Sequence, residues 1–167
     1  MSDKKNVCVG VVGAIIERDG KFLLMKEIQR HIPNHPDDGK WNLPAGRLEH
    51  GDDPIEAIRK EVIEETGYAF EPTHVLGVYS LVRKDIEQEL GTLSHVLKIT
   101  FVGTTSANPV VSVSDDSAGI QWFSAEEIQA MDRHVLRGLD IKAMIKDYRN
   151  GVWYPLNMLT HTVSPRD

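Results

Sequence analysis

The sequence predicts one α+β domain, a mixed β-sheet flanked by helices, over residues 1–167. Stretches rich in β-branched residues are interspersed with helical patterns. The 167 residues, 41% hydrophobic and 26% charged, suffice for one core. No repeat, linker or low-complexity block divides the chain, so the segments are expected to form one layered unit. Residues 1–5 are expected to be a polar tail, and residues 156–167 a C-terminal tail.

The N-terminal part is expected to begin with a hairpin. Residues 7–17 and 21–27 read as strands, and Asp19 and Gly20 between them form a favoured two-residue turn. Residues 29–40 hold two prolines and an Asp-Asp-Gly, which predicts a surface loop. A short strand over residues 41–43 should follow.

The C-terminal part is expected to add three strands and two helices. Glu71 and Pro72 are expected to interrupt the regular secondary structure after the first helix. One helix should open with a capping box between Ser124 and Glu127 and run to about residue 131. The other should cover residues 133–148 and stop at Asn150-Gly151. The remaining expected segments are strands over 74–82, 92–104 and 119–123, a charged turn over 84–91, and a polar stretch over 112–117.

The most informative stretch covers residues 43–68 and reads LPAGRLEHGDDPIEAIRKEVIEETGY. Asp53 at the N-cap, Pro54 at N1 and Glu56 at N3 follow the capping-box pattern that opens a helix. Gly67 is suited to the position just past its end. The apolar stripe expected to face the core consists of Ile55, Ile58 and Val62.

Three carboxylates share another arc of this helix. Glu61, Glu64 and Glu65 fall at i, i+3 and i+4, where like charges cost about 0.2–0.5 kcal/mol per pair. They also crowd the C-terminal half, where the helix dipole favours cations. Oxygen ligands without Cys or His suit Mg²⁺ or Mn²⁺ better than Zn²⁺. The arc therefore indicates either a metal site or a solvated acidic face.

The spacing upstream favours the metal site, because residues 46–68 resemble the Nudix box G-x5-E-x7-R-E-U-x-E-E-x-G-U, where U is a bulky apolar residue. Two positions depart from the pattern: Asp52 stands in place of Glu, and Lys60 in place of Arg. Both keep the sign of charge, although lysine lacks the bidentate fork of arginine. Activity is therefore expected to be retained. The positions that match outright are Gly46, Glu61, Val62, Glu64, Glu65 and Gly67.

The resemblance implies an α/β/α sandwich around a mixed sheet, and a Mg²⁺-dependent hydrolase of phosphoanhydride bonds. It implies that Asp52 and Lys60 orient Glu61, the first choice for general base. Three short phrases, WNLPAG, QWFSAEEI and WYPL, resemble the NudJ-type phosphatase branch of the family. The metal ligands that the resemblance implies are the Gly46 carbonyl, Glu61, Glu64 and Glu65.

The expected substrate is a nucleoside di- or triphosphate, or another small diphosphate linked to a group X. An ADP-ribose-type or oxidised-nucleotide pyrophosphatase is the nearest enzymatic alternative. A non-catalytic nucleotide-binding sensor is the alternative of another class, and the intact glutamate triad argues against it.

Composition limits the partners and the compartment. A net charge of −6 and a pI near 5.6 argue against binding to duplex nucleic acid. The single cysteine, Cys8, lies in an apolar run, where it is expected to be buried, and a lone cysteine fits a reducing cytosol. No signal peptide or membrane span is apparent. The protein is expected to be cytoplasmic, as a monomer or a homodimer.

Several further side chains have both a functional and a structural interpretation, and the structural one is favoured for each. His31 and His35 could touch a phosphate, and Glu87 or Glu89 could add a metal ligand. Gln121 lies where some relatives supply an acid. A nucleotide base could be stacked on or clamped by Tyr79, Arg83, Trp153 and Tyr154.

Overall fold

The computed structural model of the protein describes residues 7–28, 33–87, 94–112 and 119–164. The expectations for residues 1–5, His31, Glu89 and residues 113–117 therefore lie outside the described part. In chain order the elements are β1 (Val7–Arg18), β2 (Lys21–Lys26), β3 (Trp41–Asn42), β4 (Ala45–Arg47), α1 (Pro54–Thr66), β5 (Phe70–Arg83), the 3₁₀ turn η1 (Lys84–Ile86), β6 (Ser94–Thr105), β7 (Ile120–Ser124), α3 (Ala125–Ala130), α4 (Asp140–Arg149), β8 (Tyr154–Pro155) and the 3₁₀ turn η2 (Leu156–Met158).

The sheet is mixed and is organised around β1. This strand pairs antiparallel with β2 and β4, and parallel with β6 from Val7 opposite Ser94 to Ile16 opposite Gly103. Strand β6 pairs antiparallel with β5, while β2 pairs with β3 and β7. The arrangement confirms the predicted mixed sheet.

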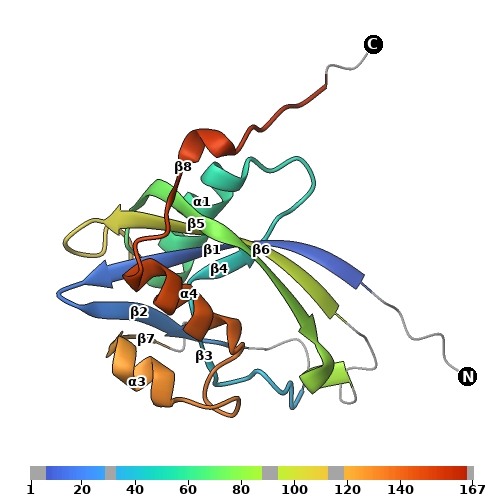
Figure 1. Cartoon of the computed structure of the whole chain (residues 1–167), viewed down its shortest axis with the longest axis vertical. Coiled ribbons are helices and arrows are strands. Elements are labelled where there is room, and N and C mark those ends of the chain that lie inside the picture. The colour runs from blue at the N-terminus through green and yellow to red at the C-terminus, as the bar shows by residue number, and fades with distance from the viewer. Residues whose placement is uncertain (1–6, 29–32, 88–93, 113–118, 165–167) are drawn as a thin grey trace, which may run out of the picture.

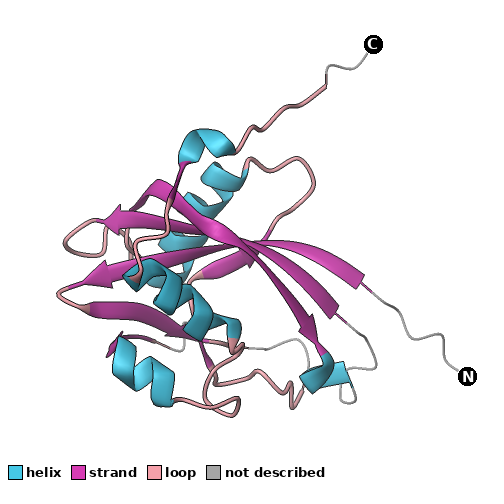
Figure 2. Cartoon of the chain, viewed as in Figure 1, coloured by secondary structure: helices cyan, strands magenta, loops and turns pink. Residues whose placement is uncertain are grey.

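Helices cover both faces of the sheet, with α1 behind it and α4 in front in Figure 1. The alternation along β1 explains the two layers, because successive side chains point to opposite faces. Ile15 packs into the cluster that contains Ile141 of α4, whereas Ala14 and Ile16 pack with Ile58 of α1. Figure 2 shows these two helical layers on either side of the strands.

The predicted β1–β2 hairpin is confirmed. Asp19 and Gly20 have φ values of 53° and 78°, as a two-residue turn between right-twisted strands requires. Strand β5 begins earlier than predicted, since Phe70 already pairs with Thr105. Pro72 does not break the strand, because the pairing register shifts between Pro72 and His74, and such an irregularity accommodates proline.

The prediction of one helix over residues 133–148 is wrong for its first half, since α4 begins at Asp140. The backbone before it is bonded to β3 instead. The Trp41 N–H donates to the Val135 carbonyl, and the Arg137 N–H donates to the Trp41 carbonyl, at 2.8 and 2.9 Å. Residues 133–135 form a turn instead, and Leu136 makes an isolated bridge to Trp41.

The prediction that Cys8 is buried is also wrong, because its side chain is exposed. Cys8 lies on the same face of β1 as Val12, but the sheet extends beyond the part of that face that α1 covers. Among the described residues, no helix is long and apolar enough to span a membrane.

Candidate active site

Helix α1 is fixed at both ends by its caps. The Asp53 carboxylate accepts from the Ile55 N–H at 2.8 Å, and Gly67 adopts a left-handed conformation with φ of 76°. The predicted capping box does not form, because the Glu56 side chain pairs with Arg59 instead. One side-chain cap and one glycine therefore set the helix boundaries.

The apolar stripe of α1 determines how its carboxylates lie. Ile58 and Val62 are fully buried against the sheet. Glu61 and Glu65 flank this stripe and are half-buried, whereas Glu64 is exposed. The three carboxylates thus run from the helix–sheet junction to solvent, which suits a site open on one side.

Gly46 of β4 lies directly against the Glu61 carboxylate. A Cβ built on Gly46 would lie 1.9 Å from the Glu61 Cδ and 2.2 and 2.3 Å from its two oxygens. Any side chain at position 46 would therefore displace the carboxylate. The structure brings together the first residue of the box and the carboxylate of Glu61.

Glu65 contacts the same strand. Its Oε2 accepts from the Ala45 N–H at 2.9 Å. Burial raises the pKa of its carboxyl to about 8, with added repulsion from Glu27 and Glu61, although the bond from Ala45 opposes the rise. Arg137 also opposes the rise, but without a bound metal ion this carboxyl tends to hold its proton near neutral pH.

The pKa of Glu61 is also raised, first by burial and then by repulsion from Glu64. Lys60 partly opposes the rise through its positive charge. The repulsion among the carboxylates is the electrostatic cost that the sequence predicted, and a bound cation would relieve it.

Asp52 lies in the loop that precedes α1. Its Oδ2 accepts from the Glu49 N–H at 2.9 Å, so it stabilises the loop turn. Asp52, Lys60 and Glu61 line one cleft of about 310 Å³, so the two departures from the box lie beside the carboxylate that they are expected to orient. The other lining residues of this cleft are Arg47, Glu49, Asp53, Glu56 and Ala57.

The donor set fits a hard divalent cation in its chemistry. Gly46, Glu61, Glu64 and Glu65 offer only oxygen, and the absence of a Cβ at Gly46 leaves room for the Glu61 carboxylate. Within the described ranges, no three His, Cys, Asp or Glu side chains are already arranged around one point. The carboxylates are therefore adjacent but not converged.

A polar network that the sequence analysis missed supports the buried side of the site. Asn42 donates to the Glu27 carboxylate at 2.7 Å, and Arg137 pairs with Glu27 and Asp37 at 3.3 Å each. Asp37 is fully buried and accepts two bonds from Arg83. The network joins distant parts of the chain, so no local spacing in the sequence could have revealed it.

The structural interpretation holds for three of the side chains considered for substrate clamping. Arg83 is buried between Asp37 and Asp85, and the Tyr79 hydroxyl donates to Asp147 at 2.9 Å. Trp153 stacks near His74 and Tyr148, with ring centroids 5.4 and 5.3 Å apart. The fourth, Tyr154, is part of the short strand β8.

The secondary candidates lie away from the carboxylates of α1 or are engaged elsewhere. His35 accepts the Asp37 N–H through its Nδ1 at 3.1 Å, which fixes the loop. Gln121 is exposed on β7, opposite Leu24 of β2. Glu87 follows η1, and its backbone N–H donates to the Lys84 carbonyl.

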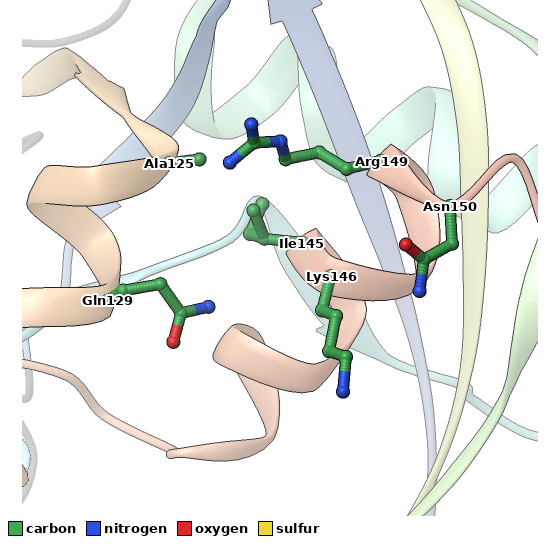
Figure 3. A pocket seen from close by; sticks show the side chains of 6 residues that line it. All are labelled: Ala125, Gln129, Ile145, Lys146, Arg149 and Asn150. Carbon is green, nitrogen blue, oxygen red and sulfur yellow. The ribbon is translucent and has the colours of Figure 1, made fainter.

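A second hollow, of about 420 Å³, lies between α3 and α4 (Figure 3). Its described lining includes Lys146 and Arg149 and no carboxylate, so it is not the predicted metal site. Arg149 pairs with Glu126 of α3 at 3.0 Å, which ties the two helices together.

Comparisons with known proteins agree with this geometry. The NUDIX domain family model matches residues 4–143. Phosphatase NudJ of Escherichia coli (strain K12) is 29% identical over 151 residues, covering 89% of this chain and 88% of that protein.

Solved structures agree as well. A NUDIX hydrolase from Nitrosomonas europaea is 34% identical, with a TM-score of 0.76, over 93% of this chain and 98% of that one. The MutT protein of Methanosarcina mazei Go1 is 25% identical, with a TM-score of 0.66, over 90% and 99% of the two chains. The chain therefore belongs to the NUDIX domain family and is a hydrolase that acts on phosphorus-containing acid anhydrides.

Proposed function

We propose that the protein is a Mg²⁺-dependent hydrolase, with Mn²⁺ as a possible substitute, that cleaves phosphoanhydride bonds in nucleoside di- or triphosphates or other small diphosphates linked to a group X. Gly46, Glu61, Glu64 and Glu65 hold the metal, and Asp52 and Lys60 orient Glu61. The similarity to Phosphatase NudJ and to the MutT protein supports a small phosphorylated substrate. The protein works in the cytoplasm.

The observation that carries this proposal is the contact between Gly46 and Glu61. A merely solvated acidic helix face would not require glycine on a neighbouring strand. Here a Cβ at position 46 would overlap the Glu61 carboxylate at 1.9 Å. The missing side chain at position 46 therefore leaves space for this carboxylate at the helix–sheet junction.

The chemistry of the site follows from these side chains. A divalent cation held by them would supply positive charge beside the phosphate oxygens. A Glu61 carboxylate oxygen accepts the proton of the water that attacks phosphorus, and the bridging P–O bond breaks to give two phosphorylated products. Glu65, fixed by the Ala45 N–H, keeps its carboxylate at the strand edge. Catalysis thus depends mainly on positioning and charge.

The test is a release assay for phosphate and pyrophosphate with Mg²⁺ across a substrate panel. The panel holds nucleoside diphosphates, nucleoside triphosphates, oxidised nucleotides, ADP-ribose and small non-nucleotide diphosphates. Products are identified by mass, which separates the favoured class from the ADP-ribose-type alternative. Tight nucleotide binding without turnover would instead indicate the sensor.

Matched variants test the residues. Glu64→Gln and Glu65→Gln should each lower kcat on the order of a hundredfold or more, because several kcal/mol of charge stabilisation is lost at about 1.36 kcal/mol per decade. Glu126→Gln, on the exposed surface of α3 and outside this cleft, is the control and should stay within about threefold of wild type. Wild-type rates in both arc variants would refute the assignment.

A further inference from the structure

Among the described strands, none pairs with the outer side of β5 over its second half. Strand β6 pairs with β5 along its whole length, from Phe70 to Arg83. On the other side, β8 pairs only with His74 and Val75. Within the described residues, no strand pairs with the outer side of residues 76–83 (Figure 1 shows β8 at the end of β5 remote from η1). Within the described part of the chain, this stretch therefore presents backbone groups that pair with no other strand.

The open stretch lacks the usual protection of an edge strand. Edges are normally blunted by charged side chains or proline. Residues 76–82 read LGVYSLV, with neither, in a chain that is 26% charged. Val78 and Val82 are 59% and 42% exposed, and Leu97, opposite Ser80 on β6, is 43% exposed. An open edge and an exposed apolar patch thus coincide.

These exposed side chains lie on one face of the sheet. Val78 is opposite Ile99, whose side chain packs in the α1 layer, and Val82 and Ser80 follow at intervals of two. Cys8 of β1 is opposite His95, which is opposite Val82. The patch is therefore the part of the α1 face that α1 does not cover.

The sequence of this edge is self-complementary. In an antiparallel pairing of two copies centred on Ser80, Val78 of one copy would lie opposite Val82 of the other. Tyr79 would lie opposite Leu81 on the other face, and Ser80 would meet its own equivalent. A two-fold interface requires that one patch fits itself in this way. The central pairs also place no like charges together, although each chain has a net charge of −6.

We propose that two copies of this chain form a homodimer by antiparallel pairing of their β5 edges about Ser80. The interface extends the sheet across the two-fold axis and buries Val78, Val82 and Leu97 of both copies. It lies outside the glutamate site, so the dimer and the proposed hydrolase activity can be tested separately.

Sedimentation at two salt concentrations tests the association. The wild type should sediment as a dimer, and more completely at higher salt, because screening reduces repulsion between the acidic chains. The Val78→Lys/Val82→Lys variant should be a monomer with unchanged kcat. Val163→Lys is the matched control, since Val163 is 71% exposed in the C-terminal segment, and it should remain a dimer. A monomeric wild type at about 100 μM, or a dimeric double variant, would overturn the proposal.

Cross-linking tests the register, with Cys8→Ser as background. Opposed Cα atoms in antiparallel pairs lie about 4.5–5.5 Å apart, within the range for a disulfide. Ser80→Cys should therefore form a covalent dimer under mild oxidation. Val82→Cys should not, because the two copies of residue 82 would be about 13 Å apart. Circular dichroism melts establish that both variants fold, and equal cross-linking of the two would contradict pairing about Ser80.

Discussion

Gly46 shows how one missing side chain can determine a site. The Glu61 carboxylate occupies the space where a Cβ would be, so the carboxylate position depends on the backbone of β4. The position of β4 is in turn fixed by pairing of Val11 to Gly13 with residues 45–47. The site is thus built from a helix and a strand, and a change on either should affect the same carboxylate.

Gly46→Ala should lower kcat on the order of a hundredfold while the protein remains folded, because a displacement of about 1 Å at a reacting group has that effect. Gly10→Ala on β1 is the control, since its Cβ would meet Leu48 at an ordinary 3.5 Å. Initial rates and thermal melts of both variants measure the difference. If Gly46→Ala kept the wild-type rate, the position of the Glu61 carboxylate would not matter for catalysis.

Glu65 should make the metal-free protein less stable as pH rises. Its pKa is about 8 in the folded state against a reference of 4.5, so the folded state binds more protons between these values. The free energy of unfolding therefore falls as pH increases through this window and is lowest above about pH 8. The pKa of Glu61 is also raised, so its ionisation likewise lowers the free energy of unfolding as pH increases.

Thermal melts in EDTA between about pH 5 and about pH 8.5 measure this dependence. Glu65→Gln cannot ionise, so its melting temperature should fall less across the window than that of the wild type. Parallel curves for the two proteins would show that Glu65 ionises normally in the folded state.

Helix α1 was predicted almost completely, because its signals are local. Asp53, Pro54 and Gly67 determine its ends within the helix sequence itself. The predicted capping box does not form because Arg59, one turn further on, competes for the Glu56 side chain. Which partner Glu56 takes depends on side-chain geometry. The start of α4 was predicted wrongly because the preceding segment forms backbone hydrogen bonds with Trp41, a residue far away in sequence. The network around Asp37 was missed for the same reason.

The N-terminal cap of α1 allows a test of what stabilises a single helix. Asp53→Ala should lower the free energy of unfolding by about 1 kcal/mol, because the Ile55 N–H loses its acceptor. Glu56→Ala should change it by no more than about 0.5 kcal/mol, since it loses only an exposed ion pair. Urea unfolding compares the two. Equal losses would indicate that the capping box forms in solution.

For the whole molecule, metal binding and folding should be linked. A ligand that binds only the folded state at about a hundredfold above its Kd adds about 2.7 kcal/mol, which corresponds to roughly 5–10 °C in Tm. Mg²⁺ or Mn²⁺ should therefore raise the Tm of the wild type and of Glu126→Gln, and raise that of Glu65→Gln much less. Differential scanning calorimetry with EDTA as the reference provides the measurement, and the same rise in all three proteins would place the ion elsewhere.

The parallel pairing of β1 with β6 also bears on how the molecule forms. Each of its ten pairs joins residues 87 positions apart, from Val7 with Ser94 to Ile16 with Gly103. The whole glutamate motif lies inside that interval. An emerging chain that ends after Tyr68 already contains every proposed ligand, but it lacks β6 and thus the central partner of β1. Closing such a long loop is slow, so appearance of the active site should coincide with late, non-local assembly of the sheet rather than with early formation of α1.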